Sequence, residues 1–310
     1  MIPLINSEAQ QFLTSLGTIQ TQLNTAEQQV STGLLVNTPS DAPDELSPIL
    51  QLHTNIAQNQ NIQNGLNTVQ TTVTAAAQAL SDSVTLLQNA SVIASEGTGS
   101  DQTAATRATL AQSVEAIQAQ MVQNATTTVS GNFVFSGDQT QTPLYQLDLS
   151  APEGVDRLAT ATNTNLVQGE GNTQFSASLT ANTIFDDTDS SGNPTANNVF
   201  AALNDLRTSL LNNDTTGINN SISELQSAST YMNNQQAFYG DVQDQITGSL
   251  NDLQNNAVQL QTQLGSLQDA NMTSAITDLT QAQTQMQAAL SAQARYPQTT
   301  LFDVLPTPSS

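Results

Sequence analysis

The first thirty residues carry one regular apolar stripe, which constrains the fold more than any other feature of the sequence. Apolar residues recur at alternating steps of four and three, and almost everything between them is polar. The stripe consists of Ile5, Ala9, Phe12, Leu16, Ile19, Leu23, Ala26 and Val30. Heptad spacing is typical of a helix that buries one seam against a partner in a coiled coil.

The far end of the chain repeats this pattern in two blocks, separated by an extra step around Asn271. The blocks are Leu253, Ala257, Leu260, Leu264 and Leu267, followed by Ala275, Leu279, Ala282, Met286 and Ala289. Such a stutter locally unwinds a supercoil and predicts a joint between two helical layers. Bringing the two chain ends side by side is the simplest way to bury both seams.

One seam paired with one partner helix buries too little apolar surface to offset the backbone entropy of ordering the helix. Neighbouring subunits are the natural source of further burial, so the seams predict an assembly interface. The residues that we assign to it are Ile5, Phe12, Leu16, Ile19, Leu23, Val30, Leu264, Leu267, Leu279 and Met286.

Between the ends, helical spacing continues and turn residues divide it. A long helix through Leu66 and Leu87 ends at the turn around Gly97, and Asp101 or Thr103 opens the next helix. The turn at 38–43 has two interpretations that the sequence leaves open. Either Asp41 caps a helix with Pro43 in its first turn, or the helix starts at Ser47-Pro48.

The stretch SGNFVFSGDQTQTPLY, residues 130–145, breaks the helical pattern. Bulky β-formers stand between two glycines, and the preceding β-branched run at 126–130 predicts the end of a helix. Strand-like pieces at 132–136, 165–168 and 173–179 are separated by Gly, Asn, Asp and Pro. Helical spacing returns near Asn198. The pattern therefore predicts a β-rich domain, 131–196, inserted into a helical body.

The predicted fold class is mainly α with an inserted β-rich domain, in an elongated rod of long antiparallel coiled-coil helices formed by both chain ends. Residues 1–40 with 270–310 are expected to form terminal coiled-coil assembly arms. Residues 41–130 with 197–269 would form a helical rod domain, and residues 131–196 an outer domain. An aromatic content of 4% suits helices packed along seams better than a large rounded core.

Charge and composition exclude several classes of function. The chain has 26 acidic residues, four arginines and no lysine, and its net charge of −22 repels phosphate and anionic lipid. We therefore expect no nucleic-acid partner and no membrane insertion. The start lacks the basic residue and apolar block of a cleaved signal peptide. The absence of Cys rules out disulfides but does not settle the compartment.

Catalytic chemistry finds little support, so we expect no enzyme, no cofactor and no metal. The single histidine, His53, stands in a polar helical stretch without an evident partner. The stretch from Asp187 to Gly192 resembles the opening of a calcium loop, but its twelfth position is Asn198 instead of a bidentate Glu. A surface turn is the better interpretation. Residues 131–196 contain no His, Cys or Lys.

Several stretches together resemble bacterial flagellins and their relatives. They are the N-terminal heptad helix, STG at 31–33, TPSDAP at 38–43, the long helix NIAQNQNIQNGLNTVQTTVTAAAQAL at 55–80, and the C-terminal heptad helix. Further segments are similar to the flagellin-like hook-associated branch at the hook–filament junction. These are GNFVFSGDQTQTPLY, NNVFAALNDLRTSLLNND at 197–214, QQAFYGDVQDQI at 235–246, LFDVL at 301–305, and Arg107 in TRATLAQSVEAI. The chain departs from that pattern at Ala42, where a second acid is usual, and in its PTPSS tail.

The resemblance implies an extracellular structural subunit of the flagellum, an adaptor between hook and filament that assembles through its terminal helices. Its implied partners are copies of itself, another hook-associated protein on the hook side and flagellin on the filament side. It also implies export without cleavage through the flagellar type III apparatus, with a cytoplasmic chaperone at the C-terminal helix. The alternatives are a divergent filament flagellin or, with less support, a secreted coiled-coil adhesin or tip protein.

Overall fold

The computed structural model describes residues 3–295, except 162, 165, 170 and 172, and describes side chains from residue 10 to residue 294 outside those gaps. The described chain is mostly helical, with a small β region in the middle, and its long helices pair antiparallel. It divides into two compact units, 1–57 with 257–310 and 58–256. The two units are described separately below.

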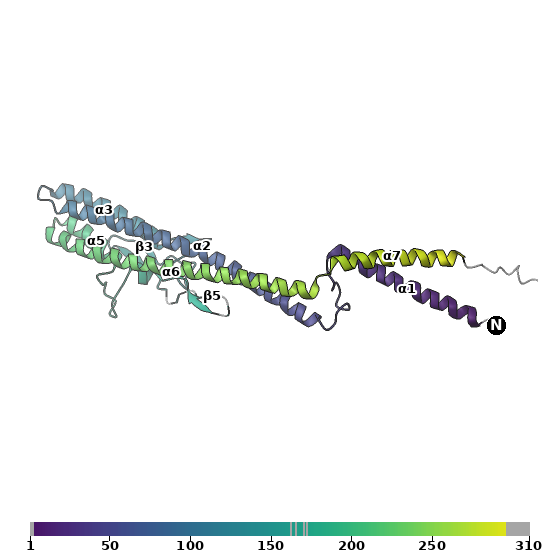
Figure 1. The fold of residues 1–310 in the computed structure, drawn as a ribbon. Helices are drawn as coiled ribbons and strands as arrows, with labels where there is room; N and C mark the ends of the chain where they lie inside the picture. Colours follow the sequence, from purple (N-terminus) through teal and green to yellow (C-terminus); the bar gives the residue numbers. More distant parts are fainter. Residues whose placement is uncertain (1–2, 162, 165, 170, 172, 296–310) are drawn as a thin grey trace, which may run out of the picture. The chain divides into compact units, whose positions relative to one another are not determined.

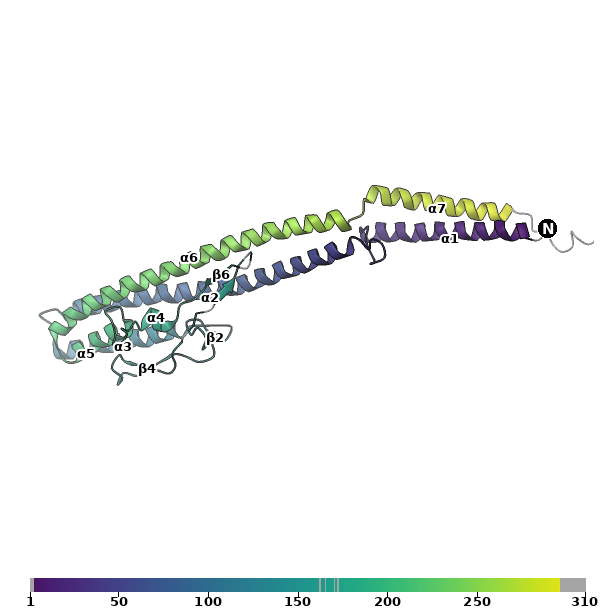
Figure 2. The same ribbon diagram turned by 90° about the horizontal axis from the view of Figure 1, so that it is seen from below.

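The first unit contains the two terminal helices, α1 (Pro3–Thr32) and α7 (Met272–Arg295), which lie antiparallel in Figures 1 and 2. Gly33 ends α1 with a positive φ of 74°. Its carbonyl oxygen accepts a hydrogen bond of 2.8 Å from the N–H of Ala270, and Leu34 forms an antiparallel bridge with Asp269. The backbone after α1 is therefore bonded to the backbone before α7, which aligns the two helices.

The predicted joint at Asn271 is a break between helices rather than an unwound stretch of one helix. Helix α6 (Thr215–Gln268) ends and α7 begins at Met272. The Oδ1 of Asn271 accepts the N–H groups of Thr273 and Ser274, at 3.1 and 3.3 Å. A side-chain oxygen that receives the first free N–H groups of a helix is an N-cap, so the residue at the stutter starts α7.

Helix α2 (Leu46–Gly97) starts between the two positions that the sequence left open, with Pro48 in its first turn. A missing N–H costs nothing there, because the first turn has no internal acceptor for it. The carboxylate of Asp41 instead closes the preceding turn: it accepts the N–H groups of Thr38 at 2.6 Å and Asn37 at 2.9 Å. These hydrogen bonds hold the pKa of Asp41 below its ordinary value, and those from Thr38 have a larger effect than the one from Asn37.

The second unit packs α2 and α6 with the shorter helices α3 (Ala104–Ala125) and α5 (Val199–Leu211) around one hydrophobic core. Thr103, one of the two predicted caps, accepts the N–H of Thr106 and opens α3. Helix α3 ends at Ala125, just before the β-branched run that predicted its end. Asn198 caps α5 through the N–H of Ala201, which confirms the predicted return of helix.

A buried arginine joins the two loops at one end of this unit. Arg107 donates from Nε to the carbonyl oxygen of Gly97 at 2.7 Å, and from Nη2 to that of Gly99 at 3.1 Å. Its Nη1 donates to the side-chain oxygen of Asn213, in the turn between α5 and α6. A cation is favoured at this place because the C-terminus of α2 carries partial negative charge.

The described residues in the middle of the chain form three antiparallel hairpins and one short helix, and Figures 1 and 2 show these elements along one side of the helices of this unit. The elements are β1 (Thr128–Val129) with β2 (Asn132–Phe133), β3 (Tyr145–Leu147) with β4 (Val155–Arg157), β5 (Leu166–Gln168) with β6 (Gln174–Ser176), and α4 (Ala181–Phe185). Ser130 and Gly131 turn the first hairpin with φ of 51° and 83°. Two positive φ values match the tight turns that suit the twist of paired strands.

The described residues of the β-rich segment share the core of the helices, because their aromatic side chains enter it. The ring of Phe135 lies 5.6 Å from Phe185 and 6.3 Å from Tyr239 of α6. Tyr145 of β3 lies 5.0 Å from Phe200 of α5. All five rings are fully or almost fully buried. The predicted strands are found, but the described residues of 131–196 share one compact unit with the helices.

Candidate assembly surfaces

The heptad stripe of the N-terminus is the least exposed line along α1. Phe12, Leu16, Ile19, Leu23 and Val30 are half-buried, and Ala26 is buried. Of the intervening side chains between residues 10 and 30, all but Gln29 are exposed. Ile5 lies in α1, but its side chain is outside the described residues. The spacing in the sequence thus identified the side of α1 that has a partner.

Helix α7 presents its own stripe in the same way. Ala275 and Ala282 are buried, Leu279 and Met286 are half-buried, and Ala289 completes the line. The two remaining predicted residues, Leu264 and Leu267, are half-buried in the last turns of α6, before the break. The structure therefore brings α1 and α7 together, and it places Leu264 and Leu267 on a separate helix of the same unit.

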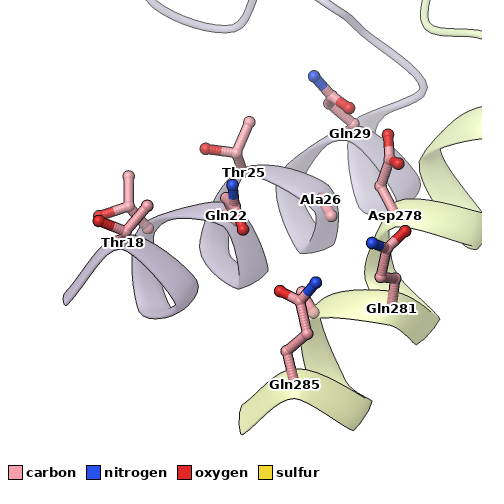
Figure 3. Close-up of a pocket in the computed structure, with 10 residues that line it drawn as sticks. Thr18, Gln22, Thr25, Ala26, Gln29, Asp278, Gln281 and Gln285 are labelled. Carbon is pink, nitrogen blue, oxygen red and sulfur yellow. The ribbon is translucent and has the colours of Figure 1, made fainter. Parts of the chain in front are cut away.

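Small residues occupy the contact between α1 and α7. Ala26 and Ala282 line opposite sides of a groove of about 480 Å³ between the two helices. Figure 3 shows Gln22, Ala26 and Gln29 on α1, and Gln281 and Gln285 on α7, along this groove. Alanine fills little space, so the groove keeps a lining of threonine and glutamine side chains.

The helix pair is almost free of charge. Helices α1 and α7 contain Glu8, Glu27, Asp278 and Arg295, whereas the whole chain carries a net charge of −22. Like charges on facing surfaces oppose association. Copies of this acidic chain can therefore approach along α1 and α7 with little repulsion.

Large apolar side chains also point away from the seam into solvent. Leu13 on α1 is 63% exposed, and Ile276 and Leu290 on α7 are 50% and 51% exposed. The sequence analysis did not assign these three residues to the assembly interface, because they lie outside the heptad positions and a single apolar residue there forms no pattern. Apolar side chains on more than one side of a helix are typical of a helix that is buried on more than one side.

His53 and the loop from Asp187 to Gly192 are the places that the sequence analysis considered for catalysis or metal binding. His53 is exposed on α2. In the loop that resembles a calcium site, Asp189 accepts the N–H groups of Ser191 and Asn193, and Asp187 accepts from Thr195. Within the described residues, no cluster of His, Cys, Asp and Glu is arranged to hold a metal ion. In the same part of the chain, no helix is long and apolar enough to cross a membrane.

Comparisons with known proteins match both ends of the chain. Residues 4–140 match the bacterial flagellin N-terminal helical region, and residues 222–305 match the bacterial flagellin C-terminal helical region. No curated protein matched the sequence.

Solved structures share the fold at low sequence identity. One is a Vibrio parahaemolyticus protein provisionally named a flagellar hook-associated protein, with 15% identity and a TM-score of 0.65, covering 74% of this chain and 100% of its own. Flagellar hook-associated protein 3 of Legionella pneumophila has 12% identity and a TM-score of 0.61, covering 71% and 98%. FlgL of Xanthomonas campestris has 15% identity and a TM-score of 0.58, covering 69% and 99%.

Proposed function

The chain belongs to the bacterial flagellin family, and we propose that it is a structural subunit of the flagellum that assembles through the α1–α7 pair. The observation that carries this proposal is the incomplete burial of the seam. Although α1 and α7 already pack together, Phe12, Leu16 and Leu279 remain half-exposed. A second layer of helices from neighbouring subunits would bury these residues and the exposed Leu13 and Ile276.

We further propose that the subunit lies at the junction between hook and filament. Supporting this position, the solved structures that match over their whole length include proteins named as hook-associated. The proposed partners are other copies of the chain, a second hook-associated protein on the hook side and flagellin on the filament side. The proposal includes export without a cleaved signal, and a cytoplasmic chaperone that holds the C-terminal helix until export.

Replacing Leu16 by Asp tests the assembly surface. A charge in the seam has to be buried without a partner when subunits pack, so we expect the Leu16→Asp protein to be absent from isolated flagella. Ser15→Asp is the matched control, because Ser15 is exposed and next to Leu16. Circular dichroism should show an unchanged second unit in both variants. Incorporation of Leu16→Asp at the wild-type level would contradict the proposal.

The position in the flagellum is tested by labelling the incorporated wild-type chain with gold-tagged antibody. A label restricted to the boundary between hook and filament supports the junction proposal. A label along the whole filament, together with growth of long filaments from the purified protein, would identify a divergent filament flagellin instead.

A further inference from the structure

We propose that α7 carries an oxidation site, Met272 and Met286, and that conversion of these two thioethers to sulfoxides weakens packing along the seam of α7. The chain has five methionines and neither Cys nor Trp, so thioethers are its most readily oxidised side chains. Four of the five methionine side chains lie within the described residues, and their exposure divides them into two pairs.

Met121 of α3 and Met232 of α6 form the protected pair. Both side chains are 0% exposed and belong to the hydrophobic core of the second unit. An oxidant dissolved in water reaches such a side chain only when the fold opens locally. Met272, at the start of α7, is 40% exposed, and Met286, near the end of α7, is half-buried. The pair on α7 is therefore expected to react first.

The two methionines of α7 stand at the large positions of its heptad seam. Met272, Leu279 and Met286 are seven residues apart, so they lie along one side of the helix. The intervening seam positions hold small side chains, Ala275, Ala282 and Ala289. Helix α1 contains no methionine, and its seam is built from leucine, isoleucine, phenylalanine, valine and alanine. Oxidation thus alters two of the three large seam side chains of α7 and leaves α1 unchanged.

The reaction transfers one oxygen atom from a peroxide to the thioether sulfur. A lone pair of the sulfur forms the S–O bond while the O–O bond breaks, so the sulfur loses two electrons. The departing oxygen takes up the proton of the transferred hydroxyl and leaves as water. A flexible apolar side chain becomes a polar one. A seam of apolar side chains offers few donors to the new oxygen, so its burial costs free energy.

The inference rests on the proposed function where it concerns assembly, because the seam has to be buried by partner helices for its polarity to matter. It adds a chemical control to that assembly: an oxidant acts on α7 while the core of the second unit stays intact. Preferential oxidation of α7 follows from the exposure of side chains within one folded chain. The oxidation site and its consequence for assembly can therefore be tested separately.

Mapping of sulfoxides in the purified full-length chain tests the site. The folded chain is treated with hydrogen peroxide, and mass spectrometry follows the gain of oxygen at each methionine over time. Met272 and Met286 are expected to react roughly tenfold or more faster than Met121 and Met232. The chain unfolded in guanidinium is the control, in which the four rates should converge. Equal rates at all four positions in the folded chain would overturn the inference.

Glutamine variants test the consequence for assembly, because glutamine is uncharged and polar and is close to the sulfoxide in size. The Met272→Gln/Met286→Gln chain should enter flagella roughly tenfold less than the Met272→Leu/Met286→Leu chain, in which the seam stays apolar. Both chains should show the same thermal unfolding of the second unit, which contains neither position. Equal incorporation of the two chains would overturn the control of assembly by oxidation.

Oxidation of isolated flagella separates this inference from the proposed function. Protection of Met286 in flagella, together with its reaction in the free chain, supports both, because neighbouring helices then cover the seam. If the wild-type chain is absent from flagella, the proposed function fails, and the mapping in the free chain still decides the oxidation site. If Leu16→Asp blocks incorporation while the glutamine and leucine chains incorporate equally, the control by oxidation fails and the proposed function stands.

Discussion

Arg157 and Asp186 form a bidentate ion pair that ties a β-hairpin to the helices of the second unit. The Nε of Arg157 lies 2.6 Å from Oδ2 of Asp186, and its Nη2 lies 2.7 Å from Oδ1. The same carboxylate, 3% exposed, accepts from the hydroxyl of Tyr145 and from the amide of Asn198. Burial raises the pKa of the Tyr145 hydroxyl, and the negative charge of Asp186 raises it further by a smaller amount. One carboxylate thus links β4, β3 and the N-cap of α5.

Replacing Arg157 by Gln should therefore destabilise the second unit. The change leaves a buried carboxylate without its cation, which costs about 3–5 kcal/mol when both partners are fully buried. The Arg157 side chain is 36% exposed, so solvent screening reduces the expected loss to about 2 kcal/mol. Chemical denaturation measures it. Asp156→Asn, on an exposed neighbouring position of β4, is the control and should change stability little.

Gly137 and Gly131 flank the aromatic stretch and should respond very differently to alanine. Both have positive φ, 53° and 83°. A Cβ at Gly131 would have no described atom within 4 Å, so Gly131→Ala should cost about 1 kcal/mol of backbone strain. A Cβ at Gly137 would lie 2.1 Å from the carbonyl oxygen of Asn163, so Gly137→Ala should cost about 3 kcal/mol. Equal unfolding free energies for the two variants would contradict the described packing.

Glu224 on α6 should contribute more to the stability of the fold in acid than at neutral pH. Its buried Oε2 has no hydrogen-bond partner among the described residues. Burial, and to a smaller extent the charge of Asp205, raises the pKa of Glu224 above its ordinary value of 4.5. Its contribution to stability is fully present below pH 4.5, where the unfolded chain is also protonated, and is lost as pH rises through the higher pKa of the folded state.

Glu224→Gln removes the charge and should therefore stabilise the protein at pH 7 but not at pH 4. The gain should be about 0.5 kcal/mol, because solvent screens a group that is only partly buried. Thermal unfolding at both pH values measures it, with Glu96→Gln on an exposed site as the control. A gain that is the same at both pH values would show that desolvation of the charge is not the cause.

Deletion of residues 146–195 is expected to damage the helical part of the second unit. It removes Phe185, which packs against Phe135 and Phe200 in the shared core. Circular dichroism should show a loss of helix larger than the deleted residues account for. Removing only the exposed turn 189–193 should spare the fold, since Thr188 and Pro194 already pair across its base. Unchanged helical arms after the long deletion would restore the sequence-based expectation of an independent outer domain.

The sequence by itself determined the helical layout of this protein. Heptad spacing identified the facing sides of α1 and α7, because a side chain every 3.5 residues returns to the same side of a helix whatever lies opposite. The β-branched run at 126–130 marked the end of α3, Thr103 was one of the two candidate caps for its start, and helical spacing returned near Asn198, where α5 begins. These signals act over a few residues and can be read without the rest of the chain.

The tertiary structure decided which side chains share a core and which stay exposed. Strand-like pieces between turn residues located β5 and β6. They did not reveal that Phe135, Tyr145 and Phe185 enter the core of the helices, or that Leu166 remains outside. Nor did any local pattern pair Arg157 with Asp186, which are 29 residues apart. Such contacts depend on how segments distant in the sequence fill one common volume, and this is determined only when all of them are in place.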